Sequence, residues 1–377
     1  MIKGALENPI GSASLASLVA PGQRVAVVTS DITRPCPSPR LLPPVLDELN
    51  RGGVPDEDIL VVFALGTHRP HTEAEKVELA GEHVYRRVRC IDSDPANCVW
   101  LGQTSRQTPV WVFRPVAQAD VRVCVGNIEY HYFAGYSGGV KAIIPGVSNP
   151  ETIQQNHRWM TEPGALAAHL DDNPVRCDIE EAGEIAGVHF ILNAILDENK
   201  TIISAVAGHP RAAHRSGCQQ LDAFGLRTIV QAADIVIVSA GGYPKDINLY
   251  QAQKALDNAR HIVRPGGLIL LVAECREGMG NRTFEKWMHE PGGPDAIIAH
   301  IQREFVLGGH KAAAVAMTMK QAQVGLVSAM PADDVRAMGF VPFGGLTQAV
   351  EYALERFSAP RITVMPEGGS VFVSGVT

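Results

Sequence analysis

Short hydrophobic runs rich in β-branched residues recur along the chain and alternate with segments whose apolar residues are spaced three or four apart. Each run has the length of one buried strand, and helical spacing marks the segments 41–51 and 249–262. Alternating strands and helices are typical of an α/β fold with mostly parallel sheets. We predict strands at 24–29, 59–64, 121–125, 234–239 and 268–272.

The predicted strands fall into two groups that divide near residue 225. A chain of 377 residues is long enough for two domains of roughly 100–200 residues each. We therefore expect an α/β domain over 1–225 and a second over 226–359. The tail, from about 360 to 377, holds strand-like pieces around a Gly-Gly turn and is a candidate to pack back on the first domain.

Polar and cationic residues follow the ends of several predicted strands, at 31–34, 66–70, 126–131 and 241–246. Ligands of open α/β sheets bind beyond the carboxyl ends of the strands. We therefore expect these four segments to contribute to one ligand-binding cleft.

Charge and cysteine content argue against several classes of function. The net charge is −7 and no tract of Lys or Arg is present, so we expect no nucleic-acid partner. Seven widely spaced cysteines without a Cys-x-x-Cys pair argue against a disulfide framework or a structural zinc site and favour the cytoplasm. No signal-peptide pattern is visible and no apolar run approaches the ~20 residues of a membrane helix, so no membrane association is expected.

The first two polar segments combine histidine, arginine and aspartate. Asp31 and Arg34 form either a helix N-cap with a surface arginine, or a carboxylate-binding arginine held by the neighbouring aspartate. His68 lies between Gly66 and Pro70, residue types that shape tight turns. It is either a solvated loop histidine or a functional one.

The segment 126–146 is the richest in candidate chemistry, because it contains His131, the Gly-rich loop 135–139 and Lys141. Glycines let backbone N–H groups approach an anion closely. The nucleoside-triphosphate loop is excluded, since that motif requires Gly directly before Lys and here Val140 intervenes. A glycine-rich turn with an exposed lysine is the alternative.

The sequence motifs give only limited support to a metal site or to a hydrolase active site. His131 and His157 carry imidazoles that suit nickel, zinc or copper, but no His-x-x-x-His or His-Glu-x-x-His pair points to a zinc hydrolase. Ser137 stands in a Gly-x-Ser-x-Gly pattern, but a nucleophile elbow directly follows a strand, and the nearest predicted strand ends at 125. No Gly-x-Gly-x-x-Gly follows the first strand, so nicotinamide binding has no support.

Gln251 and Lys254 are three residues apart and share a helix face. Two polar residues on one face indicate either a binding surface or a helix face exposed to solvent.

Five motifs together resemble the lactate racemase family of nickel-pincer nucleotide enzymes. They are SDITRP at 30–35, GTHRPHT at 66–72, EYHYFAGYSGGVKAIIPG at 129–146, NH at 156–157 and GGYPKDINLYQAQKA at 241–255. The resemblance runs over essentially the whole chain, and the ten- and sixteen-residue intervals from His131 to Lys141 and on to His157 match the family pattern.

The resemblance implies two α/β domains with the active site in the cleft between them, and a pyridinium mononucleotide whose two sulfur-containing arms hold nickel. It implies that Lys141 binds this cofactor covalently, that His157 ligates the nickel, and that separate proteins synthesise the nucleotide. His68 and His131 match the two acid/base residues. The other cofactor-contacting positions are Asp31, Phe133, Gly138, Gly139 and Pro145, and the substrate-binding positions are Arg34, Tyr250, Gln251 and Lys254.

The implied reaction interconverts the enantiomers of a small 2-hydroxyacid. One histidine takes the hydroxyl proton while hydride leaves C2, and the planar 2-keto acid then receives hydride on its other face and a proton from the second histidine. His310 and Lys311 stand near a position that is aromatic in the lactate enzyme, so they are candidates for binding a second substrate carboxylate. A protein that carries the cofactor without turnover is the alternative function, although a carrier needs neither acid/base histidine.

Overall fold

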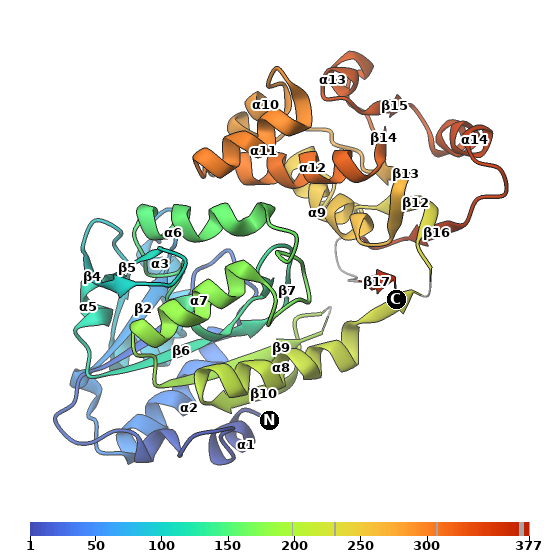
Figure 1. The fold of residues 1–377 in the computed structure, drawn as a ribbon. Coiled ribbons are helices and arrows are strands. Elements are labelled where there is room, and N and C mark those ends of the chain that lie inside the picture. Colours follow the sequence, from blue (N-terminus) through green and yellow to red (C-terminus); the bar gives the residue numbers. More distant parts are fainter. Residues whose placement is uncertain (198, 230, 307, 369–372, 377) are drawn as a thin grey trace. The chain divides into compact units, whose positions relative to one another are not determined.

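The structure is a computed structural model that describes residues 1–197, 199–229, 231–306, 308–368 and 373–376, with the backbone alone for 227–229 and 373–376. It contains two compact units, Met1–Phe224 and Gly225–Thr377. Each unit is an α/β structure with its own mostly parallel sheet, as predicted (Figure 1).

A six-stranded sheet forms the centre of the first unit. Its strands, in spatial order, are β10 (Ile202–Gly208), β9 (Phe190–Leu196), β6 (Val121–Ile128), β1 (Val25–Ser30), β2 (Ile59–Ala64) and β3 (Arg89–Asp92). Neighbouring strands are parallel except β9 and β10. The central strands are buried on both faces, which explains why the sequence shows them as continuous apolar runs.

The order of the strands reverses at β1. From β1 the chain passes through β2 to β3, then returns to the other side of β1 as β6 and continues to β9. In such a sheet, ligands bind at the carboxyl ends of the strands beside this reversal. The loops after β1, β2 and β6 meet that condition, and they carry the first three polar segments.

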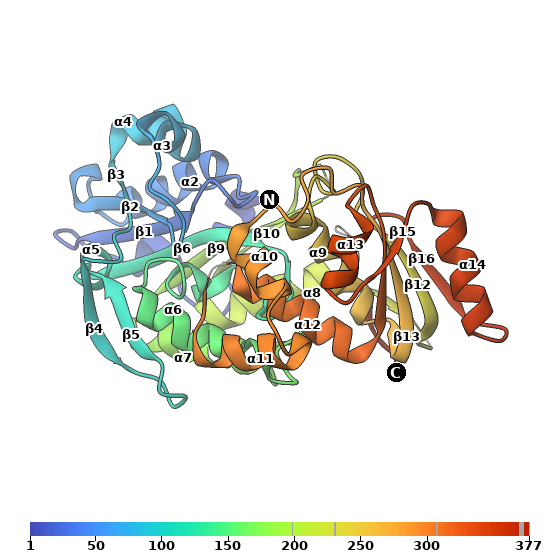
Figure 2. The same ribbon diagram turned by 90° about the horizontal axis from the view of Figure 1, so that it is seen from above.

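Helices cover both faces of this sheet (Figures 1 and 2). They are α1 (Ile2–Glu7), α2 (Ser38–Arg51), α3 (Glu73–Ala80), α4 (Glu82–Arg87), α5 (Arg114–Ala117), α6 (Pro150–His157), α7 (Pro174–Ile185) and α8 (Pro210–Gly225), with short 3-10 turns η1 (Leu15–Ser17), η2 (Asp56–Asp58), η3 (Gly139–Ala142) and η4 (Arg158–Thr161). Leu41 of α2 shares a buried core with Val27 on one face, and Cys218 of α8 shares another with Ile128. Two-stranded sheets are added by β4 (Cys98–Gln103) with β5 (Pro109–Phe113), and by β7 (Tyr130–His131) with β8 (Gly135–Tyr136).

The second unit has a five-stranded, fully parallel sheet. Its strands, in spatial order, are β15 (Val341–Phe343), β14 (Gln323–Val327), β13 (Val263–Val272), β12 (Ala233–Ser239) and β16 (Ile362–Met365), while β11 (Arg227–Ile229) pairs with β17 (Val373–Val376). The helices are α9 (Leu249–Arg260), α10 (Arg282–Met288), α11 (Gly293–Arg303), α12 (Gly309–Gln321), α13 (Ala332–Ala337) and α14 (Leu346–Arg356). Within the tail, β16 pairs with β12 and forms an edge of this second sheet, and the packing of the tail on the first domain stays a prediction.

All five predicted strands and both predicted helices are present, with ends shifted by at most three residues except for β13, which begins at Val263, five residues before the predicted start. The largest shift at a carboxyl end concerns β6, which continues to Ile128 because Gly126 and Asn127 still pair with β9. Glycine and asparagine are poor strand formers, so the sequence pattern ended this strand too early. Over the described residues, no helix is both long and apolar enough to cross a membrane.

Candidate active site

The loops after β1 and β2 bring Asp31 and His68 into contact. Asp31 is the first residue after β1 and its side chain is 5% exposed, whereas the side chain of His68 is 36% exposed. Nδ1 of His68 donates to Oδ2 of Asp31 at 2.8 Å, and the Thr33 hydroxyl donates to both carboxylate oxygens, at 2.9 and 3.0 Å. Because Nδ1 is held by the carboxylate, Nε2 is the nitrogen of His68 that can exchange a proton with a ligand.

The same contacts keep Asp31 ionised. Burial alone would raise the pKa of Asp31, but the hydrogen bonds from His68 and Thr33 and the charge of Arg34 outweigh it and hold the pKa below its usual value. At neutral pH a carboxylate therefore orients the His68 ring and stabilises the imidazolium that forms when the ring accepts a proton.

Arg34 has a different carboxylate partner from the one that the sequence suggested. Its Nη1 lies 3.9 Å from Oε1 of Glu129, the first residue after β6, and both side chains are partly exposed. The bond between Arg34 and Asp31 is a backbone one, in which the Arg34 N–H donates to the Asp31 carbonyl at 3.2 Å. A partly exposed ion pair is weak, so Arg34 can exchange Glu129 for the carboxylate of a ligand.

His131 follows β6 and is half-buried in a cluster of aromatic rings. Its ring stacks on Tyr132 at 5.3 Å and meets Phe133 edge-on at 4.6 Å, centre to centre. The backbone N–H of Ala134 donates to its Nδ1 at 3.3 Å, so the neutral ring carries its proton on Nε2. Burial, together with the positive charges of Lys141 and Arg34, lowers the pKa of His131 well below its usual value.

Lys141 lies in the η3 turn, which follows β8 in the chain. Burial is the main reason that its pKa lies well below the usual value for lysine, and the charges of Arg34 and Arg176 act in the same direction against Glu129. These surroundings favour the neutral amine of Lys141, which is the nucleophilic form.

The two glycines before Lys141 pack against protein atoms in this structure. Both have positive φ, 74° for Gly138 and 61° for Gly139, so the turn requires residues without a side chain. A Cβ on Gly138 would lie 2.9 Å from the side chain of Asn193, and one on Gly139 would lie 2.9 Å from His214. The Gly139 N–H donates to Oδ1 of Asn193 at 2.7 Å, so the anion contact suggested for this loop stays a prediction.

His157 is the last residue of α6 and is buried beside Phe133, with ring centres 5.0 Å apart. Asn149 caps α6 by accepting from the Thr152 N–H, and the next residue is Pro150, so the helix begins with two strong sequence signals. Phe133 therefore contacts both His131 and His157, and the predicted acid/base residue and the predicted metal ligand lie around one ring.

Two residues at the start of α7, Asn173 and Arg176, bind the backbone of the loop that follows His131. Neither was predicted from the sequence to belong to the site. Arg176 is fully buried, and its guanidinium donates to the carbonyls of Ala134 and Tyr136. Asn173 donates to the carbonyl of Phe133 at 3.0 Å. The sequence Asn-Pro signals a helix start, but nothing in the local pattern shows that the following arginine is buried.

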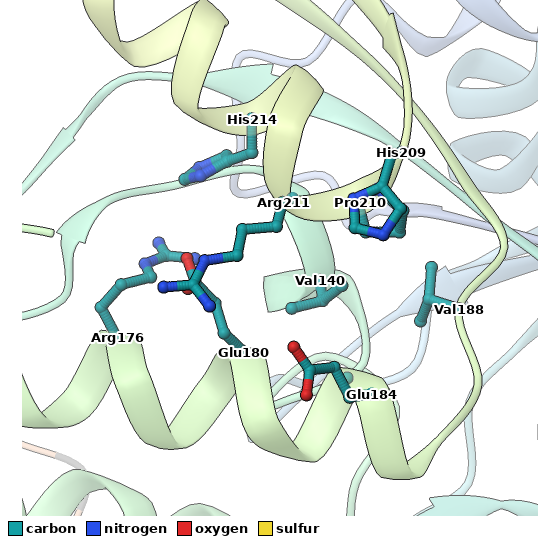
Figure 3. A pocket seen from close by; sticks show the side chains of 11 residues that line it. Val140, Arg176, Glu180, Glu184, Val188, His209, Pro210, Arg211 and His214 are labelled. Atoms are coloured by element: carbon teal, nitrogen blue, oxygen red, sulfur yellow. The ribbon is translucent and has the colours of Figure 1, made fainter. Parts of the chain in front are cut away.

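A cavity of about 50 Å³ is lined by Arg176, Glu180 and His214 among others, whose side chains are drawn in Figure 3. It is large enough to hold water. Of the predicted site residues, Gly139 lines this cavity and neither acid/base histidine does.

Ser137 does follow a short strand, β8, which the sequence pattern did not predict. Its hydroxyl nevertheless already makes two hydrogen bonds within the protein. It donates to the Asn127 carbonyl at 2.8 Å and accepts from the Glu129 N–H at 2.9 Å. The side chain joins the end of β6 to the loop and has the geometry of a structural hydroxyl, not of a nucleophile.

The predicted substrate residues of the second unit lie on α9, close to its start. Asn248 caps the helix by accepting from the Gln251 N–H at 3.0 Å. Lys254 is exposed one turn further on. The fourth strand-end segment, 241–246, follows β12 in this second sheet, whereas the other three belong to the first.

Lys311 of α12 is buried against the first turn of α9. Its Nζ donates to the Tyr250 carbonyl at 2.6 Å and lies 3.7 Å from the centre of the Tyr250 ring. Burial, and to a lesser degree the charge of Lys254, lowers the pKa of Lys311 to about 7. The preceding residue, His310, instead lies 5.5 Å from the ring of Phe305 and accepts from a nearby backbone N–H. Of the two candidates for a second carboxylate, Lys311 is the one that reaches α9.

Comparisons with known proteins give one family. A model of the lactate racemase N-terminal domain matches residues 1–168, and a model of the lactate racemase C-terminal domain matches residues 229–373. Lactate racemases from Thermoanaerobacterium thermosaccharolyticum and Lactiplantibacillus plantarum are each 32% identical to this chain, over 99% of it and 90% of their own length.

Solved structures agree with this result. The lactate racemase apoprotein from T. thermosaccharolyticum superimposes with a TM-score of 0.89 at 32% identity, covering 99% of this chain and 91% of that one. A Thermotoga maritima protein matches with a TM-score of 0.68 at 19% identity, covering 99% and 98% of the two chains, which shows a common fold alone.

Proposed function

This chain belongs to the lactate racemase family, which makes it a racemase-type isomerase, and from that premise we propose that it interconverts the enantiomers of a small 2-hydroxyacid through a 2-keto acid. The proposal also names a cofactor, the nickel-pincer nucleotide, and gives separate roles to the residues at the strand ends.

The observation that carries the proposal is the pair of histidines after β2 and β6, on either side of β1. Each has its Nδ1 engaged, His68 by donating to Asp31 and His131 by accepting from Ala134. His68 therefore presents a lone pair on Nε2, whereas the neutral His131 ring carries its proton on Nε2. Racemisation needs two such groups, one for the hydroxyl proton of each enantiomer.

Proton transfer follows from the surroundings of the two rings. For one enantiomer, Nε2 of His68 accepts the substrate hydroxyl proton, and the Asp31 carboxylate stabilises the resulting imidazolium. For the other, His131 serves: its protonated form gives a proton to the product oxygen, and burial and the nearby positive charges favour that release. Arg34 binds the substrate carboxylate, and Gln251 and Lys254 are assigned to the substrate by resemblance.

The residues fit a nickel-pincer nucleotide. The neutral amine of Lys141 is the form that can be acylated by the cofactor, and His157 offers one imidazole to the nickel. Over the described part of the chain, no group of three or more His, Cys, Asp or Glu residues could hold a metal, which leaves the other donors to the cofactor itself. When bound, such a group supplies reversible acceptance of hydride from C2.

The proposal is tested with protein purified from cells that make the cofactor. Single enantiomers of lactate and other 2-hydroxyacids are incubated without nicotinamide, and the products are separated on a chiral column. We expect racemisation of at least one acid, its loss in His68→Gln and His131→Gln, and wild-type rates in His83→Gln, which changes an exposed histidine of α4. Fully loaded protein that racemises no acid would instead indicate a cofactor carrier.

Cofactor attachment is tested separately by intact-protein mass spectrometry. We expect the wild-type protein to carry added mass and the Lys141→Arg variant to carry none, because the guanidinium of arginine stays charged and is not acylated. An adduct of unchanged mass on Lys141→Arg would contradict the assignment of Lys141.

A further inference from the structure

A buried histidine lies behind the contact between Asp31 and His68. His71 belongs to the same loop after β2, but its side chain is only 1% exposed. Its ring meets Phe63 of β2 edge-on, with centres 5.7 Å apart. No proton transfer in the proposed function uses this residue.

Both nitrogens of the His71 ring have fixed partners. Asp92, the last residue of β3, accepts from Nδ1 at 2.6 Å and from the His71 backbone N–H at 2.8 Å. On the opposite side, the backbone N–H of Ile32 donates to Nε2 at 3.2 Å. A backbone N–H can only donate, so Nε2 carries a lone pair and the ring is the neutral tautomer protonated at Nδ1.

Ile32 stands between the two residues that set the position of His68. Asp31 accepts from Nδ1 of His68, and Thr33 donates to the Asp31 carboxylate. The bond from Ile32 to His71 fixes the peptide that joins Asp31 to Ile32. The loops after β1 and β2 are thus joined at two places, by an outer bond that includes the proton-exchanging His68 and by an inner, buried bond to His71.

We propose that His71 is a positioning residue for racemisation: held by Asp92, its neutral ring fixes the backbone at Ile32 and so places the Asp31 carboxylate against His68. The inference rests on the proposed function, because it requires His68 to transfer protons. Loss of the inner bond lets the carboxylate shift, and a displacement of about 1 Å in a catalytic group costs on the order of 100-fold in rate.

Two variants separate positioning from simple structural support. His71→Phe keeps an aromatic ring against Phe63 but has no acceptor for the Ile32 N–H. His71→Gln can place its amide oxygen where Nε2 lies and restore that bond. The matched control is His83→Phe, an exposed site in the same unit.

The readout is kcat per cofactor-loaded molecule, with KM measured alongside. We expect His71→Phe to lower kcat about 10- to 100-fold with KM changed less than about 3-fold, and His71→Gln to recover most of the loss. A purely structural residue would lower the yield of folded protein in both variants without this difference in kcat. Equal kcat in the wild-type protein and in folded, loaded His71→Phe would overturn the inference.

The tautomer provides a second test that does not depend on activity. In protein labelled with ¹⁵N-histidine, long-range ¹H–¹⁵N spectra distinguish a protonated Nδ1 from a protonated Nε2, and the signals that vanish in His71→Gln belong to His71. We expect protonation at Nδ1; protonation at Nε2 would overturn the inference, because Nε2 could not then accept from Ile32. Failure of the wild-type holoenzyme to racemise any acid refutes the proposed function and this inference together, whereas an active wild type with unaffected His71→Phe refutes the inference alone.

Discussion

Replacing Lys311 by methionine is expected to change how the stability of the protein depends on pH. Lys311 is 8% exposed and its ammonium is buried against Tyr250 with a pKa of about 7. Methionine fills a similar volume without a charge. The variant loses the bond to the Tyr250 carbonyl at every pH, but it also loses the cost of burying a charge, and only the second effect titrates in this range.

The size of the titrating effect follows from the two pKa values. An unfolded lysine has a pKa of about 10.4, so between about pH 6.5 and about pH 9 it keeps a proton that Lys311 loses in the folded protein. The unfolded state then binds more protons, and folding stability rises with pH. The difference in bound protons between the unfolded and folded states, integrated over this pH interval, raises the free energy of unfolding by about 2.5 kcal/mol, at 1.36 kcal/mol for each proton and pH unit.

The assay is urea unfolding of the wild-type and Lys311→Met proteins at both pH values. We expect the wild-type free energy of unfolding to gain about 2.5 kcal/mol relative to the variant between about pH 6.5 and about pH 9. Lys320→Met, an exposed site on the same helix, is the control and is expected to parallel the wild type. Parallel curves for Lys311→Met as well would show that Lys311 keeps its proton throughout and would refute the reasoning.

Three further predictions concern the first unit and α12. Asp31→Asn removes the charged acceptor of His68 and is expected to lower kcat on the order of 100-fold, measured by chiral chromatography; a change below about 3-fold would contradict the role of the carboxylate. Ser137→Ala leaves the Glu129 N–H without its acceptor and is expected to cost about 1–3 kcal/mol in unfolding free energy while racemisation continues; loss of an esterase activity would favour the hydrolase instead. His310→Ala is predicted to change the preference between lactate and malate, and an unchanged ratio of kcat/KM values removes that hypothesis.

The strand ends were predictable because their signals are local. Buried parallel strands appear as short apolar runs, and the residues that follow them must lie at one edge of the sheet. The apolar runs alone therefore place Asp31, His68 and His131 at one edge of the sheet. The pattern fails at the end of β6, where pairing with β9 extends the strand through Gly126 and Asn127.

The partners of these residues were not predictable, since they depend on contacts distant in sequence. Asp31 was considered as a helix N-cap or as the partner of Arg34, three residues away, but its side chain accepts from His68, 37 residues away. Lys311 and Arg176 are charged residues that hydrophobic patterns place at the surface, yet both are buried and donate to backbone carbonyls. Burial of a charge depends on such a partner, and the partner is fixed only by the tertiary structure.

The central claim is that the hydrogen at C2 moves as hydride while histidines move only the hydroxyl proton. The most direct measurement is racemisation of a single enantiomer of [2-²H]lactate, or of the best acid in the panel, by cofactor-loaded protein in ordinary water. We expect the opposite enantiomer to form with deuterium retained at C2, since a hydride does not exchange with solvent. Product that has exchanged its deuterium for solvent hydrogen would mean that a base removes the C2 hydrogen as a proton, and would contradict the account.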